Sequence, residues 1–100
     1  MPGMKVSVSH NLSQDEAANR MKNLIKQVQS QFADQIKNMQ ESWAGHTGNF
    51  SFEVMGMSIK GILSILPSSV DMEGQLPFAA MPFKGKIENT IREKIAALLA

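Results

Sequence analysis

Residues 50–76 of the chain read FSFEVMGMSIKGILSILPSSVDMEGQL, and this stretch decides the fold. Apolar residues alternate with polar ones in three successive segments, which are residues 50–54, 57–65 and 70–76. A period of two places alternate side chains on opposite faces of a strand, so each segment has one apolar and one mostly polar face. Met55-Gly56 is typical of a two-residue hairpin turn, and Pro67-Ser68-Ser69 of a second turn. The stretch therefore predicts an antiparallel meander of three strands.

The two turns also set the register of this meander. Counted outward from them, Phe50 faces Gly61, and Gly61 faces Gly74. The two glycines then become cross-strand neighbours on the apolar face, with Phe50 beside them. Their missing side chains leave a notch that an aromatic ring or a helix can fill, although a bend that relieves sheet strain explains the glycines equally well.

Two further strands and two helices flank the meander. Residues 4–9 alternate and predict a first strand. Ser13 to Glu16 match a capping box, which begins a long amphipathic helix from about Gln14 to Ile36. Lys37 to Ala44 is predicted as a strand that ends in the loop Gly45–Gly48. Pro77–Pro82 is predicted as a linker, since two prolines interrupt regular structure, and a last helix runs from about Phe83 to Leu99.

The predicted order is strand, helix, four strands, helix, in a single domain of residues 1–100. This order indicates an α+β fold, with one curved antiparallel sheet of about five strands. The long N-terminal helix and the C-terminal helix are expected to pack on its apolar face, because each element has one apolar side to bury.

Composition excludes several functional classes. The chain has 100 residues, a net charge of +1 and no cysteine. So small a charge argues against a dedicated nucleic-acid binder, and without cysteine there are no disulfides or thiolate metal sites. The first ten residues lack the apolar region of a signal peptide, and the longest wholly apolar run, Ile95 to Ala100, is far too short to span a membrane. We therefore expect a cytoplasmic protein without integral membrane association.

Few residues are candidates for a chemical role. A nucleophile–base pair would need His10 or His46, and both are expected to be solvated loop residues. Neither has a companion at metal-ligand spacing. If Trp43 faces Phe50 across the loop, Glu41 shares the apolar side of Trp43, opposite Phe52. A carboxylate buried there could act on a bound ligand, whereas an exposed position at the sheet edge, or a shifted register, gives it no such role.

Several apolar residues are candidates for surface adhesion or for the lining of a pocket. Met39, Met57 and Met72 are expected to fill the core, with an adaptable apolar pocket as the alternative. The chain ends in six apolar residues without a polar cap, so this end either docks on the core, forms a homodimer or makes an exposed apolar patch. The other candidate adhesion residues are Ile62 and Leu66 on the outward face of the meander, and Lys84 and Lys86 at the start of the last helix.

Scattered motifs over residues 6–99 resemble the polyhydroxyalkanoic acid system family. They are His10-Asn11-Leu12-Ser13, Trp43-Ala44-Gly45, Phe52, Gly56, Gly61-Ile62-Leu63 and Gly74-Gln75-Leu76-Pro77, followed by a basic amphipathic terminal helix. The resemblance implies a small bacterial protein associated with polyhydroxyalkanoate storage granules, with no catalytic residues and no cofactor. The element order also resembles a shortened START-like helix-grip domain, an analogy of fold that implies no ligand.

The leading interpretation is a non-enzymatic protein that adheres to the granule surface, or to granule proteins, through apolar surface. Its candidate contacts are Ile62, Leu66, Leu98 and Leu99, with Lys84 and Lys86 at the rim. The alternative is a carrier that holds a hydrophobic or 3-hydroxyacyl ligand between the sheet and the last helix. The candidate pocket residues for such a carrier are Glu41, Trp43, Phe50, Gly61, Met72 and Gly74.

Overall fold

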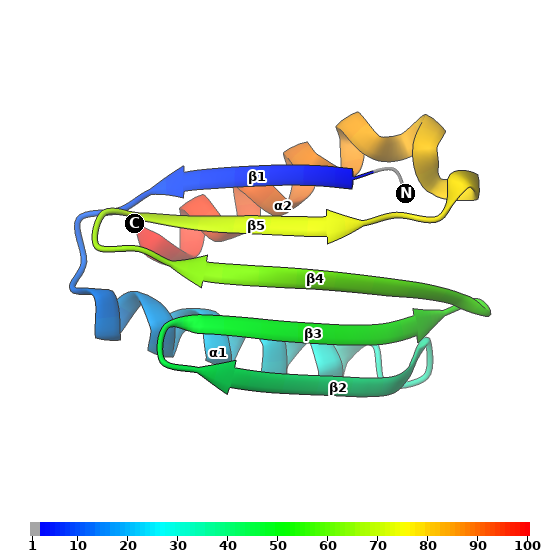
Figure 1. Cartoon of the computed structure of the whole chain (residues 1–100), viewed down its shortest axis with the longest axis horizontal. Coiled ribbons are helices and arrows are strands. Elements are labelled where there is room, and N and C mark those ends of the chain that lie inside the picture. Colours follow the sequence, from blue (N-terminus) through cyan, green and yellow to red (C-terminus); the bar gives the residue numbers. More distant parts are fainter. Residues whose placement is uncertain (1–2) are drawn as a thin grey trace.

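In the computed structural model, which describes residues 3–100, five antiparallel strands form one sheet and two α-helices lie on one of its faces (Figure 1). The elements are β1 Gly3–Ser9, α1 Gln14–Gln31, β2 Ile36–Ala44, β3 Thr47–Val54, β4 Met57–Ile65, β5 Ser69–Gln75, the 3-10 helix η1 Phe78–Phe83 and α2 Lys84–Leu99. The strand order is β1-β5-β4-β3-β2. The predicted α+β class, the five-stranded sheet and the placement of both helices are confirmed.

The predicted register of the meander is confirmed in full. Phe50 pairs with Gly61, Gly61 pairs with Gly74, and the row continues across β1 to Met4. A Cβ atom on Gly61 would overlap the ring of Phe50, and one on Gly74 would lie 3.0 Å from the Met4 methyl carbon. The notch left by the two glycines is therefore filled from both sides, by an aromatic ring and by a flexible thioether.

The register between β2 and β3 differs from the prediction. Gly45 has a φ of 61° and forms a two-residue turn with His46, so Trp43 pairs with Gly48 and not with Phe50. The ring of Trp43 packs over Gly48, where a Cβ atom would lie 2.8 Å from ring carbons. The prediction of a four-residue loop was wrong because Gly48 belongs to β3, where its missing side chain makes room for the ring of Trp43.

Helix α1 begins where the capping box predicts, with Ser13 Oγ accepting from the backbone N–H of Glu16 at 3.1 Å. Its predicted length was wrong, because the helix is short and ends at Gln31 rather than Ile36. Ile36 continues the helical apolar spacing but belongs to β2, where it pairs with Val54. The apolar spacing of the sequence continues beyond the last residue of the helix, and for this reason it predicted a helix that was too long.

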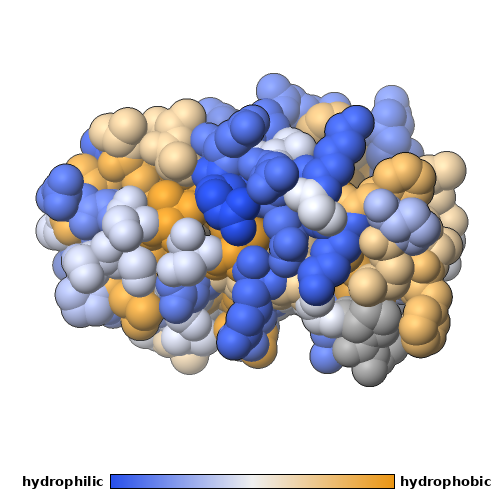
Figure 2. All heavy atoms as spheres, turned by 90° about the horizontal axis from the view of Figure 1, so that it is seen from above, coloured by the Kyte–Doolittle hydropathy of each residue, from blue (hydrophilic) through white to orange (hydrophobic). Residues whose placement is uncertain are grey.

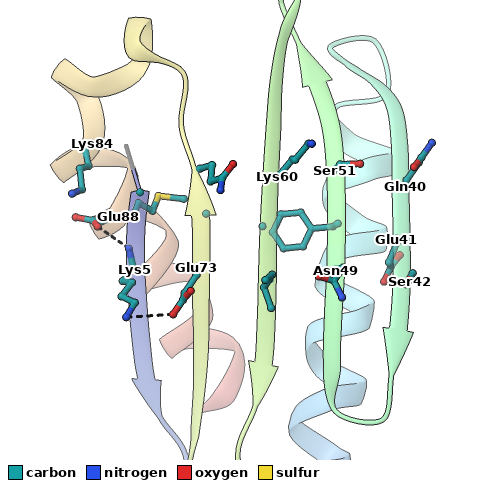
Figure 3. A pocket seen from close by; sticks show the side chains of 17 residues that line it. Lys5, Gln40, Glu41, Ser42, Asn49, Ser51, Lys60, Glu73, Lys84 and Glu88 are labelled. Atoms are coloured by element: carbon teal, nitrogen blue, oxygen red, sulfur yellow. Dashed lines mark hydrogen bonds and ion pairs between the residues drawn. The ribbon is translucent and has the colours of Figure 1, made fainter. Parts of the chain in front are cut away.

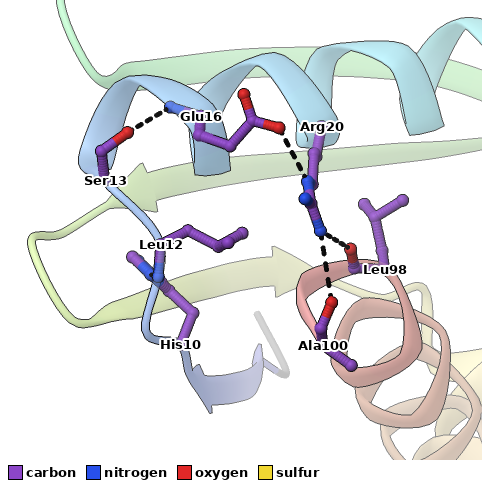
Figure 4. A network of polar contacts seen from close by, with 7 residues as sticks. All are labelled: His10, Leu12, Ser13, Glu16, Arg20, Leu98 and Ala100. Carbon is purple, nitrogen blue, oxygen red and sulfur yellow. Dashed lines mark hydrogen bonds and ion pairs between the residues drawn. The ribbon is translucent and has the colours of Figure 1, made fainter.

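The apolar C-terminal segment docks on the core. Leu99 is only 4% exposed, and Leu98 is half-buried against the same core. Nη1 of Arg20 donates to the backbone oxygens of Leu98 and Ala100 at 3.0 and 3.3 Å, while its Nε pairs with Glu16 (Figure 4). A cation from α1 thus caps the end of α2 and replaces the cap that the α2 sequence lacks.

The predicted linker is ordered as the 3-10 helix η1. Pro77 precedes it in an extended conformation, and its carbonyl accepts from the N–H of Ala80 at 2.9 Å. Pro82 lies inside η1, and the first residue of α2 follows directly at Lys84. The two prolines do exclude an α-helix here, but a short 3-10 segment tolerates them because it needs fewer backbone donors.

The core is concentrated at one end of the helix layer. Its buried apolar residues are Met4, Val6, Val8, Ala17, Ala18, Met21, Leu63, Ile65, Val70, Met72, Leu76, Ile95 and Leu99. They come mainly from β1, β4 and β5, the first half of α1 and the second half of α2. On the second half of α1, Leu24, Ile25 and Val28 are only half-buried. The helix layer is therefore closed at one end and open at the other.

Exchanging Gly61 for alanine tests the close approach of Phe50. Gly61→Ala places a methyl group where the Phe50 ring lies, so we expect a loss of about 1–3 kcal/mol in the free energy of unfolding. The control is Gly85→Ala in α2, where an added Cβ meets nothing within 4 Å and the helical backbone gains stability of about 0.5–1 kcal/mol. Urea denaturation followed by circular dichroism measures both. A shift of the same sign for the two variants would contradict this packing.

Candidate functional site

An apolar groove lies between α1 and α2 over the inner face of the sheet. Its volume is about 180 Å³. The residues that shape it include Leu24 and Val28 of α1, Met39 of β2, Phe52 of β3 and Ile91 of α2. Among residues 3–100, the polar side chains in its lining are Gln29 and Lys94, one from each helix. The groove exists because the half-buried end of α1 is not packed tightly against α2.

Two of the three methionines singled out in the sequence line this groove. Met39 and Met72 are part of its wall, whereas Met57 is half-buried and outside it. Met72 also belongs to the core, so both expected roles apply to it. Unbranched thioether side chains adjust to the shape of what they contact, which suits the wall of an apolar site.

The opposite, open face of the sheet carries a broad polar depression of about 1020 Å³ (Figure 3). Side chains of both charges line it, including Lys5, Lys60 and Glu73. Lys5 pairs with Glu73 at 3.3 Å, and the backbone N–H of Lys5 donates to Glu88 of α2 at 3.2 Å. The second contact satisfies an outward backbone donor of the edge strand β1, so these charges stabilise the sheet edge.

Four large apolar side chains are exposed at one end of the molecule, which we call the apolar end. They are Phe32 at 48%, Met55 at 87%, Phe78 at 79% and Phe83 at 60% exposure. Phe32 follows α1, Met55 is in the β3–β4 turn, and the other two belong to η1; all three places lie at the right-hand end in Figure 1. Seen from above, hydrophobic residues cover part of that end, and a hydrophilic band across the middle separates them from a second hydrophobic area on the other side (Figure 2).

The expected adhesion residues are divided by the structure. Ile62 and Leu66 are exposed as predicted. Leu99 is buried, so its prediction as a surface contact was wrong, whereas Leu98 is half-buried against the core. Lys84 and Lys86 lie in the first turn of α2, directly after η1. They therefore flank the apolar end and not the C-terminal residues.

The expected pocket residues are likewise divided. Phe50 and Met72 line the groove between the helices. Phe50 and Met4 fill the notch at Gly61 and Gly74 on the inner face. Together with Glu41, the two glycines line the depression on the open face. Trp43 packs beside the core, with the Lys22 ammonium 4.9 Å from its ring centroid, and does not line the groove.

Glu41 shares the face of Trp43, as predicted, but it pairs with Phe50 and not Phe52. Its side chain is exposed, and its Oε2 accepts a hydrogen bond from Trp43 Nε1 at 2.6 Å. The idea of a buried carboxylate at this position was wrong because β2 is an edge strand. Among residues 3–100, no three His, Cys, Asp or Glu side chains come together as a metal site would require.

The two histidines occupy different environments. His46 pairs with the exposed Asp15 at 2.8 Å. His10 was expected to be solvated but is only 6% exposed. Its Nδ1 accepts from the backbone N–H of Leu12 at 3.1 Å, and its Nε2 lies 3.0 Å from the carbonyl oxygen of Leu66. These partners require the tautomer with a proton on Nε2, so the ring links β1 to the end of β4.

Phe78, Phe83 and Lys94, like Phe32 and Met55, were not among the site residues predicted from the sequence. A signal for the first two was present, because aromatic residues in a proline-containing segment outside the apolar period have no predicted core position. No signal marked Lys94, which lies among other charged residues on α2. Its position beside the groove follows only from the packing of the two helices.

The chain belongs to a known family. The model of the family described as "Putative polyhydroxyalkanoic acid system protein" matches residues 4–99, nearly the whole chain. This finding confirms the resemblance seen in the scattered motifs. No curated protein matches the chain.

A solved structure, that of TTHA0849 from Thermus thermophilus, aligns with 98% of this chain and 92% of its own length. Sequence identity is 10% and the TM-score is 0.43, so this similarity supports no conclusion about function. In the part of the chain that the structure describes, no helix combines the length and apolar character needed to cross a membrane.

Replacing each histidine separately tests their different roles. His10→Ala removes two partly buried hydrogen bonds and leaves the Leu66 carbonyl without its partner, so we expect a loss of about 1–3 kcal/mol in stability. His46→Ala removes a contact to an exposed carboxylate and should cost less than about 1 kcal/mol. Urea denaturation curves compare the two variants. A larger loss for His46→Ala would show that the contacts of His10 contribute little.

Proposed function

We propose that this protein is a non-enzymatic member of the polyhydroxyalkanoic acid system that associates with storage granules through its apolar end. Family membership supports a role in this system. The observation that carries the proposal is the gathering of Phe32, Met55, Phe78 and Phe83 at one end of the molecule. Soluble proteins rarely gather exposed large apolar side chains without an interaction partner.

The geometry of the apolar end suits contact with a broad surface. The molecule measures 37 × 24 × 22 Å, and the strands run along the long axis, so turns and η1 form the tip. Met55 projects from a hairpin turn, and Phe78 and Phe83 from the two ends of η1. Burial of roughly 300 Å² of apolar surface at about 25 cal/mol/Å² favours binding by about 7 kcal/mol before the costs of association.

Two lysines at the start of α2 add to this contact. Lys84 is half-buried and Lys86 exposed, and both follow Phe83 closely in the chain. A lysine stem covers apolar surface while its ammonium stays in water, so these residues suit the rim of an apolar contact. The sequence predicts these lysines at the rim of a contact formed by Ile62, Leu66, Leu98 and Leu99, whereas this proposal assigns them to the rim of the apolar end.

Co-sedimentation with protein-stripped polyhydroxyalkanoate granules tests the proposal, with lipid vesicles as the comparison. We expect selective retention of the wild-type protein on granules. The variant Phe78→Ser/Phe83→Ser should lose most of its retention because these side chains are exposed and their loss leaves the core intact. Absence of wild-type retention on granules would refute the proposal.

The matched control is Ile62→Ser/Leu66→Ser, which removes two exposed apolar side chains from β4 and its end, outside the apolar end. It should retain granule binding at nearly the wild-type level. If this variant loses retention and the η1 variant keeps it, contact occurs through the open face of the sheet. Circular dichroism on each variant establishes that the fold is retained.

A further inference from the structure

We infer that the groove between α1 and α2 binds a single-chain carboxylate, with the acyl chain over the inner face of the sheet and the carboxylate paired with Lys94. The groove and the apolar end are formed by different residues, since none of the four side chains that define the apolar end lines the groove. This inference therefore goes beyond granule association and can fail or succeed independently of it.

The residues that line the groove determine which part of a ligand can bind inside it. Apart from Gln29 and Lys94, every side chain in the wall is apolar, from α1, α2 and four strands. Most of these apolar side chains belong to residues that the fold leaves only half-buried, such as Leu24 and Ile91. A hydrocarbon chain would bury this surface without leaving a polar group unpaired, whereas a polar ligand would leave its groups without partners.

The size of the groove restricts the ligand to a chain. Its volume of about 180 Å³ is below the roughly 300–1,000 Å³ that is usual for pockets enclosing a compact ligand. A linear acyl chain fits lengthwise, and its head group then stays outside, in water.

Lys94 selects the charge of that head group. It is exposed on α2, it belongs to the groove lining, and among residues 3–100 it forms no ion pair within the protein. An ammonium at the edge of an otherwise apolar groove complements an anion attached to a hydrocarbon chain. A carboxylate is the simplest head group that meets this requirement.

Methyl NMR of methionine-labelled protein titrated with decanoate, below its micelle concentration, tests the site directly. Met39 and Met72 line the groove, so their methyl signals should shift and saturate. Met55 lies in the β3–β4 turn, outside the groove, and should not shift. Shifts at Met55 without shifts at Met39 and Met72 would mean adsorption at the apolar end and would overturn the inference.

Charge reversal tests the role of Lys94. Lys94→Glu should weaken decanoate binding by about two- to fivefold or more, the factor that an exposed ion pair provides. The same variant should bind decyltrimethylammonium, which has an equally long chain and a positive head group, better than the wild type does. The control, Lys86→Glu, reverses a charge on α2 outside the groove and should leave both affinities unchanged.

A variant that fills the groove provides a second test. Val28→Trp adds volume at a half-buried position in the wall, so decanoate should no longer shift Met39 or Met72. Granule retention should be unaffected, since Val28 is not part of the apolar end. Equal affinity of the wild type for both head groups, or unchanged decanoate binding by Val28→Trp, would overturn the inference.

Discussion

The rest of the structure depends on the close approach between the Phe50 ring and the backbone of Gly61. With no side chain at Gly61 or Gly74, the inner face of the sheet is hollow at its centre, and the side chains of neighbouring strands fill it. Phe50 fills one side and Met4 the other, and Trp43 repeats the arrangement over Gly48. Because Phe50 also lines the groove, the ring that seals the sheet is part of the wall of the proposed site. Packing of the sheet and shape of the groove are thus set by the same side chain.

Helix α1 packs closely in its first half and loosely in its second half, and this difference explains why the groove lies toward one end of the helix layer. In the first half of α1, Ala17 and Ala18 are buried, since small side chains let a helix approach its neighbours closely. In the second half, Leu24, Ile25 and Val28 are larger and half-exposed. Arg20 ties the closed end together by holding the end of α2. The open half of the helix layer is therefore the place where a ligand can enter without unfolding the core.

Local patterns predicted the meander well and its surroundings less well. The register from Phe50 to Gly74 followed from two turns and strict alternation, both of which are local. The predicted β2–β3 register was wrong because a glycine such as Gly48 is typical of a loop. Here Gly48 belongs to a strand and makes room for the ring of Trp43, a role that only the packing reveals. The buried Leu99 lies between two residues whose backbone oxygens accept from Arg20 of α1, which is 78 residues away from Leu98 in the chain. Of the proposed site, Phe50 and Met72 were found from alternation, while Lys94 depends on how two distant helices meet.

The two proposed activities use separate basic residues, and helix geometry explains why they do not interfere. Lys94 follows Lys84 by ten residues, which is about 15 Å along α2 at 1.5 Å per residue. A carboxylate at Lys94 therefore lies well away from a surface that Phe83 and Lys84 contact. Since that distance exceeds the Debye length of roughly 8 Å at physiological ionic strength, the two charged sites are largely screened from each other. Occupancy of the groove can then influence granule contact only through the packing of α1 against α2, because the groove lies between these helices, Phe32 directly follows α1 and Phe83 directly precedes α2.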